Sequence, residues 1–122
     1  MDANEFKTAE GSCIISEDVV ASIVATAALE TEGVTGLANR PADLRGMMSQ
    51  NAAARSVRVL NTENETVLDV YVTILQGARI QETAVALQQN IKMAVPSMTG
   101  TPVTRVNVHI EGMTMSEEKN DD

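Results

Sequence analysis

The stretch that decides the fold runs from Ser56 to Ile74 and reads SVRVLNTENETVLDVYVTI. At its start Val57 and Val59 alternate with Arg58, and from Leu68 onward every second residue is again apolar. The residues between these two runs, 61–65, are all polar and are typical of a turn. Alternation with a period of two on both sides of a polar turn predicts a β-hairpin.

The second strand of this hairpin has two unlike faces. Its apolar face is formed by Leu68, Val70, Val72 and Ile74, and its other face by Asp69, Tyr71 and Thr73. A sheet of antiparallel strands commonly packs on a core with one face and meets solvent with the other. We therefore expect the second face to be wet or covered only by a partner.

Helical spacing appears on both sides of the hairpin. Ser16, followed by Glu17 and Asp18, predicts a helix start, because the hydroxyl caps free amides and carboxylates favour the positive end of the helix dipole. The apolar stripe that follows is Val20, Ile23, Val24, Ala27 and Ala28. Gly33 is expected to end this helix in the left-handed conformation.

A second helix is predicted from Ile80 onward, and Pro96 is expected to kink or stop it near Val95. Its apolar stripe is Ile80, Ala84, Leu87, Ile91, Ala94 or Val95, and Met98. Two further strands are predicted, one at 11–15 and one at 104–110. In the latter, Arg105, Asn107 and His109 point outward.

The order β-α-β-β-α-β predicts an α+β fold, a two-layer sandwich with two helices packed on one face of a four-stranded sheet. The simplest packing of this order is the split βαβ arrangement. The length of 122 residues suits one domain, expected at 11–112. Residues 1–10 and the acidic residues 113–122 are expected to be flexible tails, and residues 37–55 a long loop.

Composition excludes several classes of function. The chain has 17 acidic and 9 basic residues and a net charge of -8, and Phe6 and Tyr71 are its only aromatic residues. Nucleic-acid binding is disfavoured, because it needs cations for phosphates and aromatic rings for stacking. The single cysteine, Cys13, fits a reducing compartment, and no signal or membrane-spanning stretch is recognised, so we expect a cytoplasmic protein without direct membrane insertion.

Catalytic and metal motifs are weak. His109 is the only histidine and is expected to be an ordinary exposed side chain, since no nucleophile or second base accompanies it. One histidine and one cysteine fall short of a zinc site. Two formal matches, Glu63–Glu65 for calcium and Gly33–Gly36 for a phosphate-clamping GXXG loop, are better explained by a polar turn and a helix stop. We predict no enzyme activity, no metal and no cofactor.

The long loop is the candidate interaction segment. It carries Arg40, Arg45 and Arg55 against the single acid Asp43, and Met47 and Met48 stand at its middle. One interpretation is a solvated flap. The other is a contact loop whose arginines meet the acidic surface of a second subunit or an anionic partner, while the methionines supply adaptable apolar area.

Three stretches together resemble the alkaline shock proteins, a bacterial stress-response family. They run from Gly11 to Val34, beginning GSCIIS; from Gly77 to Gly100, beginning GARI; and from Val103 to Val108, reading VTRVNV. The chain departs from the family pattern at Pro96 and in the loop 37–55. The resemblance implies a cytoplasmic, non-enzymatic protein of Gram-positive-type bacteria, associated with cell-envelope homeostasis. It also implies self-association and, in some members, a small membrane-anchored partner.

Two functional hypotheses follow. The first is a self-associating structural or adaptor module that acts through protein contacts. The second is a small-molecule-binding regulatory domain, with a site near Asp69, Tyr71, Arg105 and His109. An enzyme remains only if His109 proves essential to a reaction.

Overall fold

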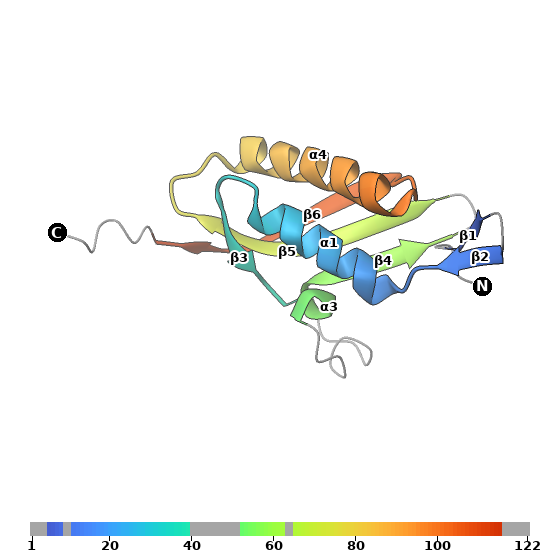
Figure 1. Cartoon of the computed structure of the whole chain (residues 1–122). Coiled ribbons are helices and arrows are strands. Elements are labelled where there is room, and N and C mark those ends of the chain that lie inside the picture. The colour runs from blue at the N-terminus through green and yellow to red at the C-terminus, as the bar shows by residue number, and fades with distance from the viewer. Residues whose placement is uncertain (1–4, 9–10, 40–51, 63–64, 116–122) are drawn as a thin grey trace.

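The computed structural model describes residues 5–8, 11–39, 52–62 and 65–115. Two helices, α1 (Glu17–Leu29) and α4 (Ile80–Thr99), lie side by side on one face of a sheet (Figure 1). The sheet consists of β3 (Val34–Leu37), β4 (Val57–Asn61), β5 (Thr66–Leu75) and β6 (Arg105–Thr114), and the short helix α3 (Ala52–Ser56) precedes β4. The predicted α+β sandwich, with two helices on one face of a four-stranded sheet, is confirmed.

Strand β5 is the centre of this mixed sheet. Along one side its first half pairs antiparallel with β4 and its second half pairs antiparallel with β3. Along the other side it pairs parallel with β6 from Val67 to Leu75, with a shift of register between Ile110 and Gly112 of β6. The parallel strands joined by α4 are therefore direct neighbours, and this βαβ unit is not split, unlike the predicted packing.

The identity of the fourth strand also differs from the prediction. The predicted strand at 11–15 exists as β2 (Gly11–Ile14), but it pairs with β1 (Glu5–Thr8) in a separate two-stranded sheet. Its place in the main sheet is taken by β3, in the stretch interpreted as a helix stop. Strand β1 lies within the predicted N-terminal tail, and β6 continues past 112 into the predicted C-terminal tail. In both segments the main chain pairs with a neighbouring strand, β1 with β2 and the end of β6 with β5.

The core lies between the helices and β5. The predicted apolar face of β5 is fully buried: Leu68, Val70, Val72 and Ile74 are each 0 % exposed. The helices contribute Val20, Val24 and Ala28 from α1 and Leu87, Ile91 and Val95 from α4. Burying one large aliphatic side chain contributes roughly 1.5–3 kcal/mol, so these residues hold the two layers together.

Helix α1 begins as predicted and ends earlier. The Ser16 hydroxyl accepts a hydrogen bond from the amide of Val19 at 3.3 Å. The helix ends at Leu29 with Glu30 as its C-cap, so Gly33 is not the stop. Gly33 does take a positive φ of 96°, but it leads into β3, where its carbonyl accepts from the Leu75 amide at 2.8 Å.

Helix α4 does not stop near Val95 but continues through Pro96 to Thr99. Beyond the proline, the last turn is held by the Thr99 hydroxyl, which donates to the Val95 carbonyl at 2.7 Å, and by the Gly100 amide, which donates to the Pro96 carbonyl at 2.7 Å. Gly100 closes the helix with φ 81°. The buried stripe is Thr83, Leu87, Ile91 and Val95; the predicted stripe was wrong at Ile80 and Met98, which are exposed.

Candidate functional site

A polar cluster lies on the sheet face opposite α1 and α4, which we call the open face. The parallel register of β5 and β6 places Asp69 beside Asn107 and Tyr71 beside His109. Residues that share a register position in a sheet share a face, so two segments about 40 positions apart in sequence converge here. We call Asp69, Tyr71, Asn107 and His109 the polar cluster.

Asp69 holds this cluster together. Its Oδ1 atom accepts a hydrogen bond from Asn107 Nδ2 at 2.9 Å and lies 3.2 Å from His109 Nε2. The Asp69 side chain is only 15 % exposed, so these neighbours replace much of its hydration. The carboxylate therefore fixes the orientation of both side chains from β6.

Tyr71 was expected on a wet face but is buried, at 7 % exposure. Its ring stacks on the ring of His109, with centroids 4.2 Å apart and an interplanar angle of 13°. His109 is accordingly not an ordinary exposed side chain, because a carboxylate binds its edge and a ring covers one of its faces. Its side chain remains 38 % exposed, which leaves a preoriented imidazole at the surface.

Three threonines extend the polar surface of the open face toward β3. The Thr35 hydroxyl lies 3.0 Å from that of Thr73 and donates to that of Thr114 at 2.9 Å. These bonds join β3, β5 and β6 at the far end of the sheet. Together with the polar cluster they give the open face hydrogen-bonding groups along much of β5.

Beside the imidazole of His109 and its orienting carboxylate, the cluster contains an amide and the phenol of Tyr71, but no serine, threonine or cysteine. A nucleophilic site would add a hydroxyl or thiol bonded to the histidine. Among the described residues, His109 shows hydrogen bonding only to Asp69. Within those same residues no group of three or more His, Cys, Asp or Glu side chains lies close enough to hold a metal ion.

The predicted site residues fall partly outside what the structure describes. Arg40, Arg45, Met47 and Met48 lie outside the described residues. Arg55 lies in the last turn of α3 and is half-buried. Of the residues suggested for a ligand site, Asp69, Tyr71 and His109 are brought together, while Arg105 stands exposed at the start of β6.

Asn107 is the member of the cluster that sequence reasoning did not include. The alternation of its strand predicted that it faces outward, which gave no indication of a partner. The parallel register supplies that partner by placing Asn107 opposite Asp69.

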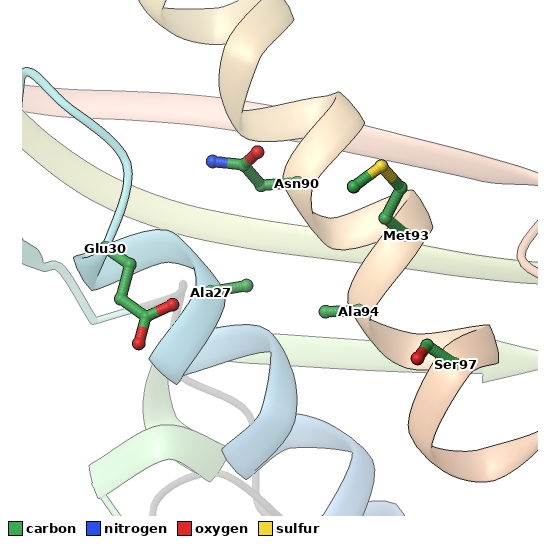
Figure 2. Close-up of a pocket in the computed structure, with 6 residues that line it drawn as sticks. All are labelled: Ala27, Glu30, Asn90, Met93, Ala94 and Ser97. Atoms are coloured by element: carbon green, nitrogen blue, oxygen red, sulfur yellow. The ribbon is translucent and has the colours of Figure 1, made fainter.

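A second surface lies between α1 and α4 on the side away from the sheet (Figure 2). This hollow of about 570 Å³ is lined by Ala27, Glu30, Asn90, Met93, Ala94 and Ser97. Figure 2 shows Ala27 and Ala94 pointing toward each other from the two helices, and their small size leaves the space open. Asn90 also donates to Thr31 Oγ1 at 2.8 Å, which ties α4 to the turn after α1.

Met93 is the large apolar side chain that lines this hollow, and it is 70 % exposed. Met98, farther along α4 and outside the lining of the hollow, is also 70 % exposed. Methionine adapts its shape to varied apolar partners, so such side chains suit contact surfaces.

In the part of the chain that the structure describes, no helix is long and apolar enough to cross a membrane.

Solved structures share this fold. The copper form of the MamM CTD superposes with a TM-score of 0.50 at 13% sequence identity, covering 80% of this chain and 87% of that one. A second MamM CTD structure also gives 0.50 at 13% identity, covering 81% and 100%. At this identity the likeness concerns the fold alone.

Sequence relatives are bacterial. The uncharacterized protein YloU of Bacillus subtilis is 27% identical over 112 residues, covering 89% of this chain and 93% of that protein. An uncharacterized protein of Streptococcus pyogenes is 28% identical over the same length, with the same coverage. YqhY of Bacillus subtilis is 27% identical over 111 residues, covering 84% of this chain and 77% of that protein.

The model of the alkaline shock protein 23 family, which is described by the words 'cell envelope-related function', matches residues 5–115. That range includes both helices, all four strands of the main sheet and the polar cluster. The resemblance to the alkaline shock proteins is thereby confirmed. The chain belongs to this family, whose function is related to the cell envelope.

Proposed function

We propose that this chain serves cell-envelope homeostasis as a non-enzymatic, self-associating structural or adaptor module in the cytoplasm. The observation that carries the proposal is the one-sided sheet. Among the described elements, α1 and α4 both lie on one face of it (Figure 1). The other face presents the polar cluster. A sheet face with fixed, partly exposed polar groups is suited to specific contacts with another protein.

The geometry of the cluster supports contact rather than turnover. Asp69 already accepts from Asn107 and His109, and Tyr71 covers one face of the imidazole. Groups fixed by one another lose little conformational freedom when a partner arrives, so the surface is preorganised. The family's relation to the cell envelope gives the setting, and a membrane-anchored protein is the partner we propose besides a second copy.

Crosslinking in living cells tests this function. In one variant a photo-crosslinkable residue replaces Thr73 on the open face. In a second variant it replaces Val85, an exposed residue on α4, which is the control for random encounters. We expect adducts from the open-face position to contain a second copy of the chain or one membrane protein. Adducts of equal yield and composition from both positions would contradict a specific interaction surface.

The second candidate is a small-molecule-binding regulatory domain. The convergence of Asp69, Tyr71 and His109 favours it, since binding sites combine apolar area with a few fixed polar groups. A thermal-shift screen against metabolites separates the two hypotheses. Saturable stabilisation that is lost in the His109→Ala variant would support the regulator; no shift with any compound would count against it.

A further inference from the structure

The outer edge of β6 is the feature that points beyond the proposed function. Among the described strands β6 pairs only with β5, so its other edge has no strand neighbour. The regular part of β6 runs from Arg105 to Ile110, before the register shift at Gly112, and it contains neither proline nor lysine, residues that commonly protect an edge from pairing. An edge of this length is able to accept another strand.

The hydrogen bonds of β5 show which backbone groups of β6 face outward. In a strand, the N–H and C=O of one residue point to one side and those of the next residue to the other. The Tyr71 carbonyl accepts from the Ala38 amide at 2.8 Å, and the Leu75 amide donates to the Gly33 carbonyl at 2.8 Å. Odd-numbered residues of β5 therefore face β3, and even-numbered residues face β6.

The parallel register transfers this pattern to β6. In a parallel pair, a residue that bonds to its neighbour lies opposite one whose bonds point away. Leu68 lies opposite Val106, Val70 opposite Val108 and Val72 opposite Ile110. The backbone groups of Val106, Val108 and Ile110 therefore point to the outer edge. The Val106 carbonyl accordingly accepts a bond from Gln88 Nε2 of α4, at 3.0 Å, and keeps a second lone pair.

We infer that a second copy of this chain pairs with this edge, β6 against β6 and antiparallel, with Val108 of both copies at the twofold axis. This rests on the proposed self-association and names its interface. In this register the outward backbone groups meet, because Val108 faces Val108 of the partner subunit and Val106 faces Ile110 of the partner subunit. The two four-stranded sheets become one continuous sheet.

Side chains along this edge are complementary in the same register. Asn107 faces His109 of the partner subunit. Arg105 and Glu111, both exposed, lie equally far from Val108 on either side, and Glu111 is the extra residue at the register shift between Ile110 and Gly112. Arg105 therefore lies next to Glu111 of the partner subunit, where the regular pairing ends. A shift of two residues would place Arg105 opposite histidine or methionine instead. Opposite charges at facing positions stabilise a strand pair, so the charges select this register.

The dimer also joins the polar clusters. Facing residues of antiparallel strands share a face of the sheet, so both open faces lie on the same side. Asn107 and His109 are the members of the cluster on β6, next to the interface. Two copies thereby present one continuous polar surface, and this is larger than what a monomer offers to a further partner.

Disulfide trapping tests the position of the axis. In a Cys13→Ser background, Val108→Cys places two thiols at facing positions, where Cα atoms lie about 5.5 Å apart and a disulfide can form. Ile110→Cys is the matched control, since residue 110 is half-buried like residue 108. The two control thiols would stand roughly 13 Å apart along the strand, beyond disulfide reach. We expect a covalent dimer for the first variant and none for the control.

Charge exchange tests the register independently. Arg105→Glu and Glu111→Arg each create like charges at facing positions and should weaken dimerisation roughly tenfold or more. The double variant restores opposite charges and should recover the wild-type dissociation constant. Glu32→Arg is the control, because Glu32 is exposed in the turn before β3, which pairs with the opposite side of β5. Sedimentation velocity measures all four.

The outcomes separate this interface from self-association itself. Suppose that neither single charge reversal changes the dissociation constant of the dimer and that the Val108→Cys variant forms no disulfide. This result would overturn the β6 interface but would leave self-association itself supported. A chain that stays monomeric at every concentration would overturn both.

Discussion

Leu68 shows at the scale of one residue how the core holds the two layers together. It lies on the central strand β5 and is fully buried, whereas Leu60, on the neighbouring strand β4, is 46 % exposed. Leu68→Ala should lower the free energy of unfolding by about 2–5 kcal/mol, through lost burial and the cavity that remains. Urea denaturation measures this change.

Leu60→Ala is the matched control in the same hairpin. It removes the same atoms from a largely solvated site and should change the free energy of unfolding by less than about 1 kcal/mol. Equal losses for the two variants would mean that the face of β5 we describe as the core is not the one that stabilises the protein.

Alanine substitutions at Gly33 and Gly77 distinguish the cost of backbone strain from the cost of steric crowding. Both have nearly the same φ, 96° and 97°, so an alanine strains the backbone equally at the two positions. A Cβ at Gly33 would lie 2.9 Å from Thr83 Oγ1, whereas a Cβ at Gly77 meets nothing within 4 Å. Gly33→Ala should therefore destabilise by about 1 kcal/mol more than Gly77→Ala.

The comparison of melting curves for these two variants checks the prediction. If Gly77→Ala proves the more destabilising, then the close approach of the Gly33 turn to α4 does not exist as described.

The side-chain alternation of β5 could be predicted from sequence, but the surroundings of Tyr71 and His109 could not. The apolar period of two places Leu68 and Val70 in the core whatever the strand order. The stacking of Tyr71 on His109 depends on the parallel register with β6, which the side-chain pattern of either strand leaves undetermined. Long-range pairing decides such contacts.

At the scale of elements, α4 contains an unfavourable residue. Pro96 lacks the amide that would bond one turn back to Lys92, yet the helix runs on to Thr99. Pro96→Ala supplies this amide and removes the ring, so the free energy of unfolding should rise by about 1 kcal/mol or more. A marked loss of stability would show instead that the proline ring packs favourably. Chemical denaturation decides between the two.

Strand β3 marks the limit of prediction for elements. It is only four residues long and includes Gly36, so it shows no alternation to recognise. It forms because its main chain completes the second half of the β5 edge, from Val34 opposite Ile74 to Leu37 opposite Val72. Both helices, in contrast, carry apolar stripes long enough to be identified, and their starts were predicted more closely than their ends.

At the scale of the molecule, the charge of the segment 37–55 leads to a prediction about association. Reversing Arg40, Arg45 and Arg55 to Glu should weaken self-association or capture of an anionic partner, because the rest of the chain is acidic. Sedimentation at low and high salt measures the effect, which salt should diminish. Lys92→Glu, an exposed change on α4, is the control for net charge.

Arg55 is half-buried, so its reversal is also followed by melting temperature. If the variants with Arg40 and Arg45 reversed keep wild-type association and wild-type partner retention, the segment is a solvated flap. The β6 interface does not depend on that outcome, because none of its facing residues belongs to this segment.

The composition of the whole chain indicates which classes of function are disfavoured, but it does not predict which residues contact one another. Few aromatic residues and an excess of acid disfavour nucleic-acid binding, and its absence stays a prediction from composition. The polar cluster is invisible at that scale, because Asp69 and Asn107 are common residue types that meet only through the sheet register. The fold class was therefore predictable, while the candidate site needed the topology.

Self-association is the central claim, and sedimentation equilibrium of the full chain over a wide concentration range tests it most directly. We predict a monomer–dimer equilibrium at physiological salt that Arg105→Glu shifts toward monomer and that Arg105→Glu with Glu111→Arg restores. A single species with the mass of one 13.0 kDa chain at every concentration would contradict the account.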